Sequence, residues 1–135
     1  MLKRFLLWLT VTVTGFGVLG GGYHLYLAEH PARILVVVDS SFPMQTSWSK
    51  VSSALNEIRE RPYTEFSLYT EKGIVHGWQR GLFLRTTTPY APRDWSKLAD
   101  IRRAKEFGEA TEVVLITNDP AYSGAPGGWS VKRLE

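Results

Sequence analysis

Oxygen-bearing side chains follow two strongly apolar runs of the sequence. Asp39, Ser40 and Ser41 come directly after the first run, and Asn118 and Asp119 come after the second. Carboxylates, amides and hydroxyls are the ligands that Mg²⁺ and other hard cations prefer. A carboxylate after a buried strand can also accept a phosphoryl group, or it can cap a turn or the next helix. The sequence therefore concentrates its candidate chemistry at these two positions.

The two runs are typical of strands in a parallel sheet. Residues 34–38 and 113–116 are continuously apolar and mostly β-branched, as expected for strands buried on both faces. Residues 65–69 and 74–78 are two shorter strand candidates, and their spacing suits a hairpin. Ligand sites in parallel sheets lie at the carboxyl ends of the strands, which is where the oxygen-bearing groups stand.

Two helices are predicted between these strands. The first shows apolar residues at helical spacing at Trp48, Val51, Leu55 and Ile58. The second begins at Asp94, a suitable N-cap, and is expected to continue to Gly108. The predicted order is β-α-β-β-α-β, an α/β domain over residues 29–119 with helices flanking the sheet.

The last sixteen residues, 120–135, hold three glycines and two prolines and show no helical or strand period. We expect a Gly/Pro-rich C-terminal tail, with Tyr122 and Trp129 anchoring its docking to a partner. In the alternative interpretation, Trp129 folds back on the uncovered sheet edge of its own domain.

The N-terminus predicts a membrane anchor. Residues 5–27 carry no formal charge, and a helix of this length can cross a hydrocarbon core of about 30 Å. Lys3 and Arg4 precede the run, so the positive-inside rule predicts a cytoplasmic N-terminus. We therefore expect a single-pass transmembrane helix over residues 1–28 and an extracytoplasmic domain, periplasmic if the source is bacterial. A cleaved secretory signal is the alternative.

Glycines within this segment suggest helix packing. Gly17 and Gly21 have the small-xxx-small spacing that lets two membrane helices approach closely. The alternative is that glycines are simply common in membrane helices. The expected partners are the membrane and other integral membrane protein subunits.

The composition argues against nucleic-acid binding and excludes cysteine chemistry. Of 16 basic residues two precede the anchor, so the remainder has 14 basic and 13 acidic residues, a net charge of +1. A nucleic-acid binder should show a clustered basic face, and none is expected here. The chain has no cysteine, which excludes disulfides and thiolate chemistry.

The chain resembles a shortened von Willebrand factor type A (vWA) domain, with a small Rossmann-like sheet. The resemblance rests on the segment Asp39-Ser40-Ser41 after the first strand, the hairpin at 65–79, the threonines at 86–88 and the strand 113–117 that leads into Asn118-Asp119. The family has two further strands and helices after this strand. The resemblance therefore implies a sheet edge that something must cover.

The resemblance also implies a metal site, in a degraded form. The family binds a divalent metal through an Asp-x-Ser-x-Ser loop, a later threonine and an aspartate. Asp39 and Ser41 match the first two positions, Pro43 replaces the second serine, and Asn118 stands where the aspartate is expected, with Asp119 next to it. One residue of 86–88 can supply the threonine. Because the pattern is degraded, we expect no bound cofactor, and Mg²⁺ is the alternative.

Catalysis has little support in the sequence. There is no phosphate-binding glycine loop, and no nucleophile-elbow sequence supports a triad of Ser40, His76 and Asp119. We expect a non-catalytic accessory subunit that stabilises or helps assemble a larger respiratory, photosynthetic or transport complex. The alternative is a metal-dependent adhesion or substrate-binding module around Asp39, Ser41 and Asp119.

Overall fold

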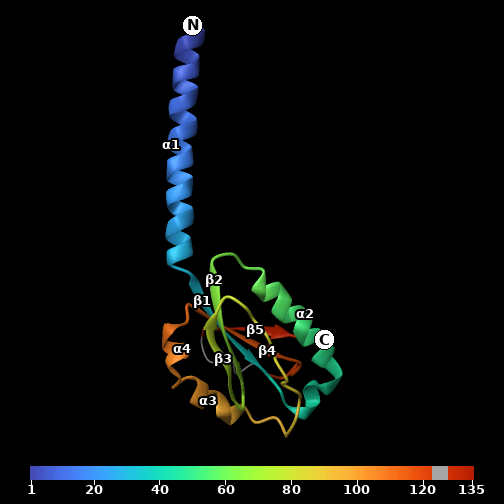
Figure 1. Ribbon diagram of the computed structural model, residues 1–135. Coiled ribbons are helices and arrows are strands. Elements are labelled where there is room, and N and C mark those ends of the chain that lie inside the picture. Colours follow the sequence, from blue (N-terminus) through green and yellow to red (C-terminus); the bar gives the residue numbers. More distant parts are fainter. Residues whose placement is uncertain (123–127) are drawn as a thin grey trace. The chain divides into compact units, whose positions relative to one another are not determined.

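The apolar N-terminal run forms one long helix in the computed structural model, which describes residues 1–122 and 128–135. The chain divides into two units, Met1–Pro31 and Ala32–Glu135 (Figure 1). Helix α1 is Leu2–Glu29, and its 28 residues correspond to about 42 Å of helix. It is the one helix of the described residues that is long and apolar enough to cross a membrane.

Hydrogen bonds within the helix satisfy the Thr10 hydroxyl and close the C-terminal end of α1. The Thr10 hydroxyl donates to the carbonyl of Leu6 at 2.9 Å, as a helical threonine can when no partner is present. At the other end, the backbone N–H of His30 donates to the carbonyl of Tyr26 at 3.0 Å. Pro31 follows directly, and a proline cannot continue the helix.

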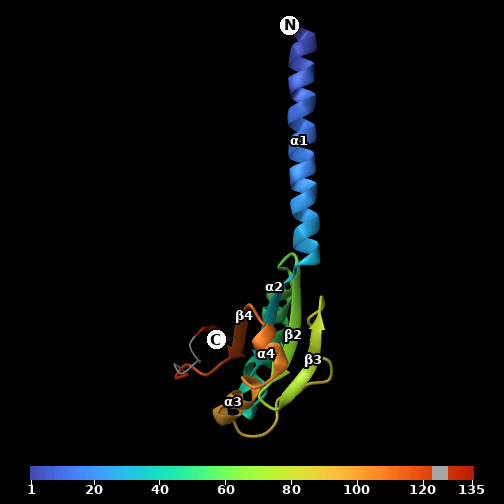
Figure 2. The same ribbon diagram turned by 90° about the vertical axis from the view of Figure 1, so that its left-hand side faces the viewer.

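The second unit is a five-stranded mixed sheet with the order β3-β2-β1-β4-β5. The strands are β1 Ala32–Val38, β2 Thr64–Thr70, β3 Gly73–Gln79, β4 Glu112–Thr117 and β5 Trp129–Arg133. β1 runs parallel to β2 and to β4, β4 runs parallel to β5, and only β3 is antiparallel to its neighbour (Figure 2). The expectation of an α/β domain behind an N-terminal apolar helix is confirmed.

Helices cover both faces of the sheet. The 3₁₀ helix η1, Phe42–Ser47, and helix α2, Trp48–Arg59, lie on one face. The 3₁₀ helix η2, Trp95–Lys97, with the short helices α3, Leu98–Ile101, and α4, Lys105–Glu109, lies on the other (Figure 1).

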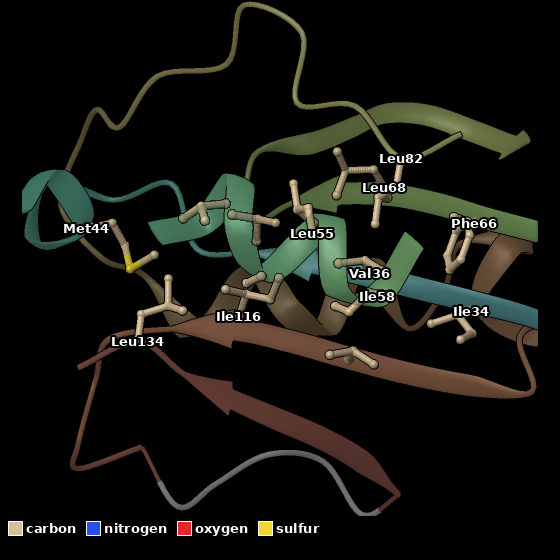
Figure 3. Close-up of a cluster of buried hydrophobic side chains, with 14 residues drawn as sticks. Ile34, Val36, Met44, Leu55, Ile58, Phe66, Leu68, Leu82, Ile116 and Leu134 are labelled. Atoms are coloured by element: carbon tan, nitrogen blue, oxygen red, sulfur yellow. The ribbon is translucent and has the colours of Figure 1, made fainter. Parts of the chain in front are cut away.

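Strand β1 shows why its sequence is apolar throughout. Ile34, Val36 and Val38 face α2 and belong to one core cluster, while Leu35 and Val37 face α3 and α4 and belong to the other. All five are at most 3% exposed. Figure 3 shows the first cluster, in which Val36 lies among side chains of α2 and β2. Burying each of these side chains contributes about 1.5–3 kcal/mol.

The helix expected from Asp94 to Gly108 is broken after Ile101. Asp94 does cap the first turn, since its carboxylate accepts from the backbone N–H of Ser96 at 3.0 Å. In a continuous helix Phe107 would lie about 120° around the axis from Ile101, away from the apolar face. The break before Lys105 lets Phe107 turn inward, where its ring lies 5.9 Å from that of Trp129.

The C-terminal segment corrects the expectation of a tail without secondary structure. Residues Trp129–Arg133 form β5 and continue the sheet beside β4, with Trp129 in register with Val113. Leu134 then donates its N–H to the carbonyl of Thr117 at 2.9 Å and is buried in the α2-side core. The pattern was missed because only Trp129 and Val131 of this strand are apolar.

Candidate functional site

The carboxyl ends of β1 and β4 bring together the residues that the sequence singled out. These strands are neighbours, and the chain leaves β1 toward β2 on the other side, so their ends form the switch point of the sheet. Ligands of open α/β sheets bind at such a point. Asp39 follows β1, and Asn118 and Asp119 follow β4. The backbone N–H of Asp39 also donates to the carbonyl of Ile116 at 2.9 Å.

Asp39 is buried, with 1% of its surface exposed, and both of its oxygens accept several hydrogen bonds. Oδ1 accepts from the backbone N–H of Ser41 at 3.0 Å and from its hydroxyl at 2.6 Å. Oδ2 accepts from the hydroxyl of Thr117 at 2.8 Å and from Nε of Arg93 at 2.8 Å. A buried carboxylate needs hydrogen-bond donors at both oxygens, because an unpaired buried charge is strongly destabilising.

Arg93 is the main residue of this site that the sequence analysis missed. Its Nη2 lies 2.8 Å from Oδ2 of Asp39 and donates to Oδ1 of Asn118 at 2.5 Å. Its Nη1 lies 3.6 Å from Oδ2 of Asp119. The guanidinium group therefore connects the oxygens of all three residues. The only signal in the sequence is an isolated cation at the end of a turn-rich loop, which does not indicate where its side chain lies.

These residues do not fit a divalent cation. The guanidinium of Arg93 lies among the oxygens of Asp39, Asn118 and Asp119, on which the metal site implied by the resemblance depends. The threonines of that site are also elsewhere, since Thr86, Thr87 and Thr88 line a separate hollow. Within residues 1–122 and 128–135, no cluster of three or more His, Cys, Asp or Glu side chains suits a metal.

A second buried network surrounds Ser40. The carboxylate of Glu71, which is 6% exposed, accepts from the backbone N–H of Ser40 at 2.8 Å and from its hydroxyl at 3.1 Å. Nζ of Lys72 lies 3.0 Å from Glu71 and donates to the Ser40 hydroxyl at 2.9 Å. The same ammonium lies 3.6 Å from the ring centroid of Tyr90. Glu71 and Lys72 lie between the two strands of the predicted hairpin, and no pattern in the sequence indicates this role.

A hollow of about 390 Å³ opens beside this network. Lys72, Arg85, Ile74 and the threonines at 86–88 contribute to its lining. Arg85 has a φ of 53° and Ala91 a φ of 66°, so the loop between them begins and ends in the left-handed region. Side chains other than glycine rarely adopt this conformation, and such strain is often found near binding sites.

The remaining candidates pack within their own domain. Tyr122 stacks on Trp95 with ring centroids 4.3 Å apart, and its burial raises the pKa of the Tyr122 hydroxyl. Trp129 is buried against Phe107. His76 contacts the carbonyl of Gly77 at 2.9 Å and accepts from the backbone N–H of Phe83, and within residues 1–122 and 128–135 no hydrogen bond joins it to Ser40.

Comparison of the chain with models of known protein families, with curated proteins and with solved structures found no match. The function is therefore inferred from the residues and their arrangement.

Proposed function

We propose that this protein is a non-catalytic, single-pass membrane subunit that stabilises or helps assemble a larger membrane complex of the respiratory, photosynthetic or transport kind. Helix α1 packs against another integral membrane protein, and the α/β domain, a shortened vWA-type domain, makes contacts outside the cytoplasm. No divalent metal takes part in these contacts.

The observation that carries the proposal is that the apolar surface of α1 is exposed along the helix. None of its residues is buried, and its large apolar side chains, among them Trp8, Phe16 and Leu19, are exposed. A Cβ atom added at Gly17 or Gly21 would meet nothing within 4 Å among the described residues. Nothing within the described chain therefore requires glycine at these positions. Close approach of a second helix would require it.

The α/β domain supports a binding role rather than a catalytic one. Asp39 is the most buried acid at the strand ends, and its oxygens are occupied by Ser41, Thr117 and Arg93. A general base or nucleophile needs a free oxygen within reach of a substrate. Asp39 offers none without first losing one of these partners.

Purification of the full chain from its native membranes in mild detergent tests the proposal. We expect other membrane proteins to copurify in fixed stoichiometry, and a lone monomer would contradict the assembly role. Replacing Gly17 and Gly21 together by Leu should release these partners. Replacing Gly15 and Gly22 together by Leu is the matched control, because these glycines lie on the opposite side of the helix and are equally unobstructed.

Topology can be measured directly because the chain lacks cysteine. A single cysteine at the exposed position Ser130 should react with a membrane-impermeant maleimide from the extracytoplasmic side. A cysteine at Leu2 should stay protected until the membrane is permeabilised. The mass of the purified chain distinguishes an intact anchor from a cleaved signal sequence.

A small-molecule binding module is the second candidate, and the hollow beside Ser40 favours it. Arg85 brings a positive charge to its lining, next to Lys72, whose charge is paired with Glu71, so the ligand would be a small anion. Inorganic phosphate or citrate should then raise the thermal midpoint of the full chain. Arg85→Ala should remove the effect, and Arg80→Ala, at an exposed position outside the hollow, should not. The candidate is excluded if neither anion shifts the midpoint of the unmodified chain.

A further inference from the structure

Arg93 ties together three segments that are far apart in the sequence. It comes from the loop between β3 and η2, and its guanidinium reaches Asp39 after β1 and Asn118 and Asp119 after β4. Its side chain is only 18% exposed. A surface ion pair would leave the guanidinium in solvent. Here it is held between groups that the fold has already fixed.

The charges and atoms around Arg93 are those of a cation site. Two carboxylates and one amide oxygen point at the guanidinium. The hydroxyls of Ser41 and Thr117 hold the carboxylate of Asp39 in place from its other sides. Carboxylate, amide and hydroxyl oxygens are the usual ligands of Mg²⁺ and related hard cations, which complete their coordination with water.

We propose that Arg93 is a built-in cation that takes the place of a divalent metal ion at the switch point of the sheet. The site is consequently metal-independent in the natural protein, and removing the guanidinium uncovers a site for Mg²⁺ or Mn²⁺. Asp39, Asn118 and Asp119 supply the oxygens of this latent site, with Ser41 beside them. This inference does not rest on the proposed assembly role, since it concerns the domain alone.

An ordinary structural ion pair predicts a different result. If Arg93 only paired with two acids, its removal would leave two poorly organised carboxylates and no affinity for metal. Arg33 provides this comparison within the same domain. It bridges Glu65 at 3.4 Å and Glu109 at 3.3 Å, but its side chain is 40% exposed.

The test is calorimetric titration of Mn²⁺ into the full chain in detergent. Arg93→Ala should bind one Mn²⁺ with a Kd of about 1 mM or tighter. The unmodified chain and Arg33→Ala should bind at least about tenfold more weakly. Adding Asp39→Asn to Arg93→Ala should abolish the gained binding. Equal binding by the unmodified chain, or no binding by a folded Arg93→Ala protein, overturns the proposal.

A second variant and a second measurement keep the test decisive if Arg93→Ala does not fold. Arg93→Gln removes the charge and keeps most of the side-chain volume, and it should gain the same Mn²⁺ binding. If both variants are unfolded without metal, Mn²⁺ should restore the circular dichroism spectrum of the unmodified chain. Failure of Mn²⁺ to restore it in either variant also overturns the proposal.

Discussion

Replacing Trp129 tests whether the C-terminal segment is a strand of the domain. Its side chain is 9% exposed and packs in the α3/α4-side cluster, with its ring 5.9 Å from that of Phe107. A buried tryptophan removes about 150–250 Å² from water, which at about 25 cal/mol per Å² gives about 4–6 kcal/mol as an upper bound. Truncation of such a residue typically costs about 3–5 kcal/mol. We expect Trp129→Ala to lower the free energy of unfolding by that amount.

Trp129→Phe should behave differently. The indole N–H is buried and finds no hydrogen-bond partner in the parts of the chain that the structure describes, 1–122 and 128–135. An unpaired buried donor costs about 1–3 kcal/mol, so its removal offsets the smaller ring, and we expect a net change within about 1 kcal/mol. Ser130→Ala, at the exposed neighbouring position, is the control and should change stability by less than about 0.5 kcal/mol.

Urea unfolding of the full chain in detergent, followed by the fluorescence of the other tryptophans, measures these differences. The reasoning is refuted if Trp129→Ala costs less than about 1 kcal/mol. That result would mean that β5 does not contribute to the core in solution.

Two further predictions concern titration on the α3/α4 side of the sheet. Burial, together with a hydrogen bond of 2.8 Å to Glu106, raises the pKa of Tyr69 to about 12. The neutral form of Tyr69 therefore stabilises the fold below pH 10, and this contribution is lost as the pH rises through 12. Difference absorbance titration against Tyr69→Phe should find this tyrosine ionising last, and Glu106→Gln should lower its pKa only in part. The indole of Trp78 donates to Glu109 at 2.7 Å and lowers the pKa of that carboxyl, so its contribution to stability is lost as the pH falls toward the folded-state pKa. Trp78→Phe should raise the pKa of Glu109 toward its ordinary value in carboxyl NMR titration, and an unchanged value would exclude the hydrogen bond as its cause.

Much of the sheet is predictable because its strands have local signals. The continuous apolar runs mark β1 and β4 as buried on both faces, and the turn at Glu71 and Lys72 marks the hairpin. The apolar spacing of α2 identifies the face that covers the sheet. The break between Ile101 and Lys105 is different, because it depends on where Phe107 packs rather than on local propensity.

Of the residues of this site, only those that follow β1 and β4 are predictable from the sequence. Parallel strands with neighbouring carboxyl ends bring Asp39 to Asn118 and Asp119 whatever else the fold does. The position of Arg93 depends on the path of the preceding loop, which turns through a left-handed residue at Ala91. Hydrophobic periodicity does not predict such a turn. The sequence therefore could not show that the side chain of Arg93 reaches Asp39 and Asp119.

β5 also changes the argument about the free edge of the sheet. The resemblance implies that the edge beside β4 needs a cover, and β5 supplies it from the same chain. β5 then becomes the edge, but it is short and carries Lys132 and Arg133. Lys132 pairs with Glu57 of α2, and Arg133 donates to the carbonyl of Tyr122 at 3.2 Å. Short, charged edge strands resist pairing with another sheet. The edge at β5 therefore does not require a partner strand, so the proposal of a partner rests on α1 rather than on this edge of the sheet.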